Sequence, residues 1–165
     1  MKRIIFVRHA KAEVQNSSIS DFERSLALKG KYMASLMASM LKEKTDQEAT
    51  VISSPAFRAI ETAMIFCKVL GYDTGKIIMN ENLYPGTGLK GLKAILQEAG
   101  DDADTIMLFG HNPAFSDLPD TLCKHGCDIM PKCGVISISF KIQTWSEIKQ
   151  KTGKTEYYLK PEKVL

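Results

Sequence analysis

The strongest constraint on the fold is a regular alternation of short apolar runs with longer helix-like segments. The runs are rich in β-branched residues and too short for helices, which is typical of buried strands. They cover residues 2–7, 50–53, 76–79 and 105–109. Between the runs, apolar residues recur every three or four positions, which predicts amphipathic helices. These helices cover residues 29–41, 55–70, 89–98 and about 113–122.

The last part of the chain has a strand pattern only. Residues 135–142 alternate apolar and polar side chains, and residues 155–159 follow a Thr152-Gly153 turn, so two further strands are expected. We therefore predict an α/β protein with a three-layer αβα sandwich, whose mostly parallel sheet has an antiparallel edge strand. Residues 1–165 are expected to form a single domain.

Two helices have the same expected start signal. Ser54 before Pro55, and Asn112 before Pro113, combine a residue that can cap a helix N-terminus with a proline that tolerates the first helical position. Both signals follow directly after predicted strands. The sequence therefore predicts that two helices start close to the carboxyl ends of two strands.

Charge and hydropathy exclude several classes of protein. The 22 basic and 19 acidic residues give a net charge of +3, which is too balanced for a protein dedicated to nucleic acids or membrane surfaces. No run of 18 apolar residues occurs, and the apolar run near the start is too short for a signal peptide. We expect a soluble cytoplasmic protein that binds neither nucleic acid nor a membrane.

The four cysteines are expected to be reduced thiols, because no secretory leader accompanies them. Cys123, His125 and Cys127 lie close together, but no second ligand pair with zinc spacing follows them. We therefore expect no metal and no cofactor, and His125 is interpreted as a solvated loop residue.

Chemically active side chains follow three of the predicted strands. Arg8 and His9 follow the first, Arg58 lies one turn into the helix after the second, and His111 follows the fourth. Ligands of open α/β sheets bind outside the carboxyl ends of strands, so these side chains are expected to share one crevice. Each alone is more often structural; together they favour a site.

Two arginines and two histidines predict a site for a phosphoryl group. Arg8 and Arg58 present planar guanidinium groups that grip phosphate oxygens in pairs. A neutral His9 can attack phosphorus in line, while His111 and the arginines stabilise charge on the other oxygens. The expected intermediate is a phosphohistidine, which water then hydrolyses.

Four stretches of the chain resemble the histidine phosphatase, or phosphoglycerate mutase-like, superfamily, and within it the small SixA-type phosphohistidine phosphatases. The stretches are FVRHAKAE at residues 6–13, DFERSLALKG at 21–30, SSPAFRAIETA at 53–63 and GHNPAFSDL at 110–118. This resemblance implies that His9 is the phosphorylated nucleophile and that Arg8, Arg58 and His111 complete the phosphate pocket. It also implies metal independence and a phosphoglycerate mutase-like fold.

Two features distinguish the chain from most of that superfamily. Ala10 stands where the first motif usually has glycine, as SixA-type members often have it. Many members also carry an inserted cap that determines specificity, and 165 residues leave little room for one. An open site of this kind suits a phosphoryl group carried by a protein.

The general acid is the least defined part of the predicted site. Many relatives have a carboxylate after the third strand, where this chain has Asn82, with Glu81 one position away as a candidate acid. The imidazole of phosphohistidine leaves more readily than an alkoxide, so a missing acid favours a phosphohistidine substrate. Lys11 and Asp117 lie in the matched stretches, and we interpret both as surface residues.

We therefore predict a phosphatase that hydrolyses phosphohistidine on a protein, with a phosphohistidine-bearing signalling or phosphotransfer domain as its partner. One alternative is a small-molecule phosphomonoesterase of the same superfamily, in which Glu81 would matter strongly. The other is a phosphoprotein-binding module without turnover, although binding alone would not require the nucleophile.

Overall fold

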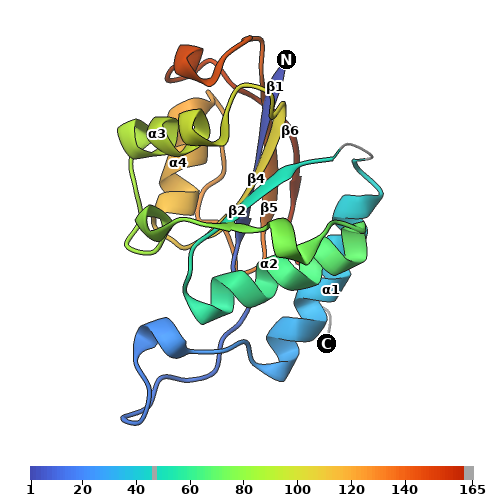
Figure 1. The fold of residues 1–165 in the computed structure, drawn as a ribbon, viewed down its shortest axis with the longest axis vertical. Helices are drawn as coiled ribbons and strands as arrows, with labels where there is room; N and C mark the ends of the chain where they lie inside the picture. The colour runs from blue at the N-terminus through green and yellow to red at the C-terminus, as the bar shows by residue number, and fades with distance from the viewer. Residues whose placement is uncertain (46–47, 162–165) are drawn as a thin grey trace.

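A computed structural model describes residues 1–45 and 48–161 and places a six-stranded sheet between two pairs of helices (Figure 1). The strands are β1 (Lys2–Arg8), β2 (Thr50–Ser53), β3 (Ile78–Met79), β4 (Thr105–Gly110), β5 (Val135–Phe140) and β6 (Lys154–Leu159). Their order in the sheet is β3-β2-β4-β1-β5-β6. The first four are mutually parallel, and β5 runs antiparallel to both β1 and the edge strand β6. The predicted fold class is therefore confirmed.

The helices cover the sheet in pairs. They are α1 (Leu28–Lys42), α2 (Phe57–Leu70), α3 (Leu89–Ala99) and α4 (Ala114–Leu122). Because side chains alternate along a strand, β1 buries Ile5 and Val7 in the core beneath α1 and α2, and Ile4 and Phe6 in the core beneath α3 and α4. Burial on both faces explains why β1 is a continuous apolar run rather than an alternating one.

Two helices begin later than predicted, α2 by two residues and α4 by one. Helix α2 begins at Phe57, not at Pro55, because the Ser54 hydroxyl accepts the backbone N–H of Ala56 and completes a turn before the helix. Helix α4 begins at Ala114. Asn112 does not cap it, because its side chain accepts the hydroxyl of Ser116 and donates to the Met130 carbonyl.

Two predicted strands are shorter than expected. The third predicted strand, 76–79, is reduced to Ile78–Met79, because a 3-10 turn occupies Thr74–Lys76, where the Asp73 carboxylate accepts the N–H of Gly75. The strand predicted at 135–142 ends at Phe140. The remaining boundaries differ from the prediction by at most one residue, within the usual uncertainty of helix and strand ends.

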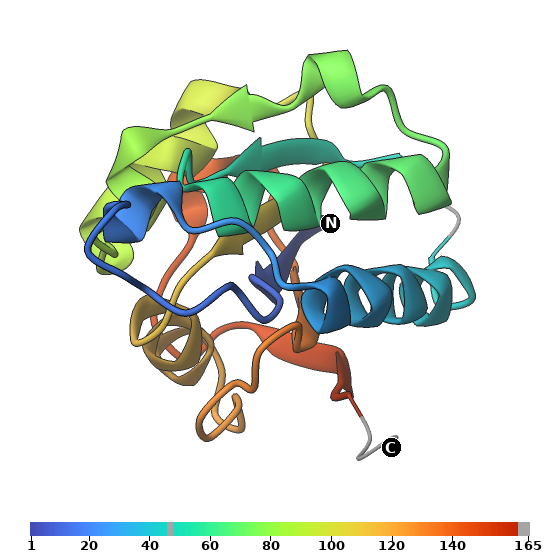
Figure 2. The ribbon, with the colours of Figure 1, turned by 90° about the horizontal axis from the view of Figure 1, so that it is seen from below.

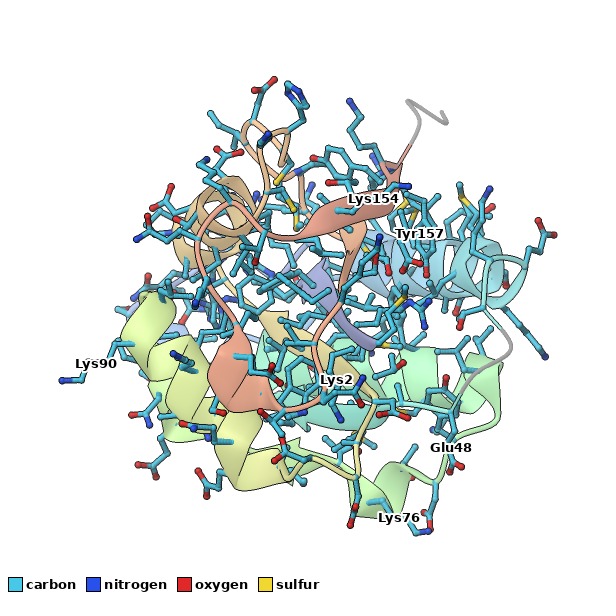
Figure 3. The ribbon with its side chains drawn as sticks, turned by 90° about the horizontal axis from the view of Figure 1, so that it is seen from above. Lys2, Glu48, Lys76, Lys90, Lys154 and Tyr157 are labelled. Atoms are coloured by element: carbon cyan, nitrogen blue, oxygen red, sulfur yellow. The ribbon has the colours of Figure 1, made fainter. Side chains whose placement is uncertain are left out.

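The two ends of the sheet differ in character. Figure 2 looks onto the end where the parallel strands finish, and the long segment between β1 and α1 crosses it. Figure 3 shows the opposite end, where the ammonium group of Lys2 lies 3.0 Å from a carboxylate oxygen of Asp104 and 5.5 Å from the Trp145 ring. Among the described residues, no helix is both long and apolar enough to cross a membrane.

Candidate active site

The carboxyl ends of β1, β2 and β4 lie side by side, as their pairing requires. Arg8 at the end of β1 pairs with Gly110 at the end of β4, and Ser53 of β2 pairs with Phe109. His9 continues the first strand, since its backbone N–H donates to the Gly110 carbonyl at 3.0 Å. The structure thus brings the predicted strand-end residues to one edge of the sheet.

His9 is held in one neutral form. The residue is buried, and its Nδ1 lies 2.7 Å from the carbonyl oxygen of Ala10. Because a carbonyl oxygen only accepts hydrogen bonds, Nδ1 carries the proton and Nε2 keeps its lone pair. Burial lowers the pKa of His9 to about 3 and outweighs the hydrogen bond to Ala10, which favours the charged form. At neutral pH the residue therefore has the uncharged imidazole that a nucleophile needs.

His111 lies against His9 and is also neutral. The two ring centres are 5.1 Å apart. Burial, with a smaller contribution from the charge of Arg58, lowers the pKa of His111 to about 4. Its Nε2 is 2.8 Å from the Ser54 hydroxyl, which accepts the N–H of Ala56 and can donate its own proton to the ring. In that arrangement the ring proton is on Nδ1, which is buried and has no partner in the described part of the chain.

The loop that precedes β5 holds Arg8 in position through hydrogen bonds. Its Nη1 donates to the Met130 carbonyl at 2.9 Å, and its buried Nε has no partner among residues 1–45 and 48–161. Cys133, in the left-handed backbone region with φ 62°, donates its N–H to the carbonyls of Arg8 and His9. This loop therefore fixes the backbone of Arg8 and His9. Within the described residues, the Nε–H of Arg8 is left free to donate to a ligand.

Arg58 comes from the first turn of α2, as predicted, and a carboxylate orients it. Its Nη1 donates to the backbone carbonyl of Asp21 at 2.8 Å, and its Nη2 donates to Oδ2 of the same residue at 3.0 Å. On the other side of the helix turn, the Arg58 carbonyl accepts the hydroxyl of Thr62, which in turn accepts the N–H of Ala10. The segment that follows β1 is therefore joined to α2 beside Arg58.

Asp21 and Tyr84 are site residues to which the sequence analysis assigned no role. The Tyr84 hydroxyl donates to Oδ2 of Asp21 at 2.9 Å, and the Tyr84 ring centre is 5.6 Å from that of His111. Partial burial opposes ionisation of Asp21, but hydrogen bonds from Arg24, Tyr84 and Arg58 lower its pKa to about 2. Asp21 lies in the matched DFERSLALKG stretch, which was the available signal, but its partners are distant in sequence.

The candidate acid Glu81 lies on the surface. It begins a 3-10 turn, Glu81–Leu83, in which Glu81 and Asn82 are exposed and Leu83 is buried. Tyr84 is the residue of this segment whose side chain reaches the histidines. A role for Glu81 as general acid stays a prediction.

The other residues singled out from the sequence lie outside the site. His125 is exposed, whereas Cys123 and Cys127 are buried. Within the described ranges, no group of three or more histidine, cysteine, aspartate or glutamate side chains could hold a metal ion. Asp117 is exposed on the first turn of α4, where it lines a hollow. Lys11 is exposed two residues after His9.

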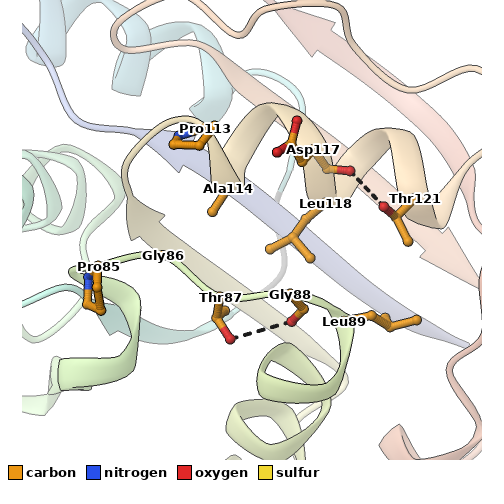
Figure 4. A pocket seen from close by; sticks show the side chains of 10 residues that line it. All are labelled: Pro85, Gly86, Thr87, Gly88, Leu89, Pro113, Ala114, Asp117, Leu118 and Thr121. Atoms are coloured by element: carbon orange, nitrogen blue, oxygen red, sulfur yellow. Dashed lines mark hydrogen bonds between the residues drawn. The ribbon is translucent and has the colours of Figure 1, made fainter.

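An open hollow of about 340 Å³ lies beside the site, between the start of α4 and the segment 85–89 (Figure 4). It begins at Pro113, two residues after His111, and at Pro85, directly after Tyr84. Its lining is small and mainly uncharged, with Asp117 as the charged member. The hollow can accept part of a substrate that extends from the histidines.

A family model confirms the resemblance found in the sequence. Residues 4–83 match the histidine phosphatase superfamily (branch 1). The match includes β1 with Arg8 and His9, the segment containing Asp21, and the start of α2 with Arg58. A search of curated proteins found no match.

Solved structures share the fold over nearly the whole chain. The protein histidine phosphatase SixA, complexed with tungstate, is 23% identical, with a TM-score of 0.79 and coverage of 96% of this chain and 97% of that one. A SixA-type protein from Nakamurella multipartitia is 18% identical, with a TM-score of 0.80 and coverage of 98% and 96%. A mycobacterial glucosyl-3-phosphoglycerate phosphatase is 14% identical, with a TM-score of 0.67 and coverage of 97% and 99%. At these identities the similarity establishes the fold alone.

Proposed function

We propose that the protein is a metal-independent phosphatase that hydrolyses phosphohistidine on a cytoplasmic signalling or phosphotransfer protein. The observation that carries this proposal is the state of His9. Its proton is held on Nδ1 by the Ala10 carbonyl, so its Nε2 is unprotonated, and His9 is buried together with His111 and Arg58 beside the half-buried Arg8. The superfamily match over residues 4–83 supports the same class of chemistry.

The reaction proceeds in two displacements at phosphorus. The lone pair of His9 Nε2 forms a bond to phosphorus, while the P–N bond of the substrate breaks and its imidazole leaves, protonated by solvent. Water then attacks the phosphoryl group on His9, the P–N bond to the enzyme breaks, and inorganic phosphate leaves. His9 recovers its lone pair, so the enzyme returns to its starting form.

The surrounding donors stabilise the transferring group. Arg8 has an unused, buried Nε, and the guanidinium of Arg58 is oriented by Asp21. His111, neutral and held through Ser54, supplies an N–H from Nδ1. Donors that are fixed before the reaction stabilise charge on the equatorial oxygens without a cost of reorganisation.

The carboxyl groups near the site favour phosphohistidine over an alkyl phosphate. An alkoxide leaving group needs a proton donor, and Asp21, with a pKa of about 2, is ionised at neutral pH. Glu81 is exposed on its 3-10 turn. Imidazole, with a reference pKa of about 6.5, needs no strong acid from the protein.

The main alternative is a small-molecule phosphomonoesterase. It is favoured by the fold similarity to the glucosyl-3-phosphoglycerate phosphatase. Against it, the described lining of the hollow beside the site contains no basic side chain that could bind a second anionic group of a small substrate, and Asp117 adds negative charge at its rim.

The test is a panel of substrates with wild type and the His9→Asn variant. We expect the wild type to hydrolyse a phosphohistidine protein at least about a hundredfold faster than alkyl phosphomonoesters, since removing a needed general acid commonly costs that much. The variant should hydrolyse neither. Comparable turnover of both substrate classes would favour the phosphomonoesterase, and binding without turnover would favour a phosphoprotein-binding module.

A further inference from the structure

A second hollow, of about 300 Å³, lies near the nucleophile on the α1 side of the sheet and is basic. We call this hollow the lysine pocket, because Lys11, Lys29 and Lys132 line it. Tyr32 and Met33 of α1 add apolar surface between them. Neither the phosphate chemistry nor the hollow at α4 uses these residues.

The fold holds Lys11 and Lys29 close to the backbone segment that contains His9. Lys11 follows His9 by two residues, and its carbonyl accepts the N–H of Ala27 at 2.9 Å. The first turn of α1, which carries Lys29, packs so closely here that a Cβ on Gly30 would lie 2.0 Å from the Lys11 carbonyl oxygen. Only glycine allows this approach.

The third lysine reaches the pocket from the loop before β5. Lys132 precedes Cys133, whose N–H donates to the carbonyls of Arg8 and His9, at 3.1 Å in each case. The three ammonium groups therefore come from three segments, and both the start of α1 and the loop before β5 are hydrogen-bonded to the segment at residues 8–11 that contains His9. Figure 2 shows these segments meeting at the same end of the molecule as the site.

Within residues 1–45 and 48–161, no carboxylate pairs with the lysine pocket. Its three lysines are exposed. Three like charges at one hollow repel each other, and an incoming anion relieves that repulsion. Tyr32 and Met33 belong to residue types that are enriched at protein interfaces, and the exposed lysines around them match the polar rim of such an interface.

We propose that the lysine pocket docks an acidic segment of the partner protein that flanks the phosphorylated histidine. This inference rests on the proposed function and deepens it, because it states the chemistry that distinguishes one phosphoprotein from another. Aspartate or glutamate side chains of the partner pair with Lys11, Lys29 and Lys132 while the phosphoryl group occupies the arginine site. Such pairing mainly accelerates association and lowers KM, and salt weakens it.

The experiment uses two synthetic peptides that each carry one phosphohistidine. In one peptide the flanking residues are aspartate and glutamate, and in the other they are asparagine and glutamine. At low salt we expect kcat/KM of the wild type to be roughly tenfold higher for the acidic peptide, because three exposed ion pairs together stabilise the complex by about that factor. The preference should fall toward one at high salt.

A matched pair of variants assigns the preference to the pocket. The triple variant K11Q, K29Q and K132Q should lose most of the preference. The control triple variant K76Q, K90Q and K154Q removes the same charge from exposed lysines outside the pocket (Figure 3) and should keep it. The single variant K132Q, whose substitution removes one exposed charge, should lose part of the preference and guards against misfolding of the triple variant.

The outcomes separate the two proposals. Equal hydrolysis of both peptides by the wild type, or equal loss in the two triple variants, overturns the docking site and leaves the proposed function standing. Failure of the wild type to hydrolyse either peptide overturns the proposed function and, with it, the docking site.

Discussion

Acid should destabilise this protein through its two buried histidines. The pKa values of His9 and His111 are about 3 and about 4, because burial disfavours the charged ring. In the unfolded chain both should titrate near the reference value of about 6.5. Between those limits the unfolded chain binds more protons than the folded protein, so the free energy of unfolding falls as the pH falls.

The size of the effect follows from the displacement of each pKa. At pH 5.0 the solution is about 1.5 units below the unfolded value, and each unit corresponds to about 1.36 kcal/mol. Each histidine therefore removes about 2 kcal/mol between pH 7.5 and pH 5.0, and the pair removes about 4 kcal/mol, a large part of the stability of a typical domain. Asp21, with a pKa of about 2, adds its own loss only below about pH 4, where the carboxyl group of the unfolded chain protonates.

Urea unfolding at pH 7.5 and pH 5.0 measures this difference. The wild type should lose about 4 kcal/mol and the His9→Asn variant about 2 kcal/mol, because one buried histidine has been removed. His125→Asn, which replaces an exposed histidine, is the matched control and should behave as the wild type. Equal losses in wild type and His9→Asn would refute the assignment of His9 as a buried, neutral imidazole.

Three further predictions concern activity. The acid limb of kcat/KM should lie well below pH 6, because the pKa of His9 in the free enzyme is about 3; an apparent pKa above about 7 would contradict this. Gly30→Ala should reduce kcat/KM by roughly tenfold or more, because its Cβ would lie 2.0 Å from the Lys11 carbonyl oxygen, two residues after His9; activity equal to that of the wild type would contradict this. Asp21→Ala should lower kcat/KM by about tenfold by releasing Arg58, and Asp21→Asn, which keeps an acceptor, should restore part of the loss; equal effects of both variants would argue against a positioning role.

The sequence was sufficient for the sheet and for the placement of the predicted residues. Strand β1 is buried on both faces, so its apolar run is unmistakable, and the residues that follow it must lie at its carboxyl end. Parallel pairing then brings His9 and His111 to the same edge. Arg58 joins them because it lies in the first turn of the helix after β2.

The orientation of those side chains could not be predicted, because it depends on contacts between distant segments. Asp21 meets Arg58 across 37 residues and Tyr84 across 63. Ser54 looked like a helix cap in the sequence, and in the structure its hydroxyl instead completes a turn and lies against the ring of His111. Local patterns indicate which residue types are present, whereas tertiary packing determines their partners.

The physical reason for a neutral His9 also differs from the expectation based on charge. Two arginines are expected beside it, and nearby positive charge disfavours protonation of a ring. In the structure, burial lowers the pKa of His9 more than the neighbouring charges do. Loss of water around a ring is a property of the packed fold and cannot be inferred from neighbouring residue types.

The central claim is that His9 accepts the phosphoryl group. The most direct test incubates the protein with a phosphohistidine protein labelled on phosphorus, quenches the reaction in alkali, and measures label bound to the enzyme before and after mild acid. The account predicts a transient, acid-labile label on wild type, located on His9, and none on His9→Asn. Turnover without any labelled enzyme, or label that persists in the His9→Asn variant, would contradict it.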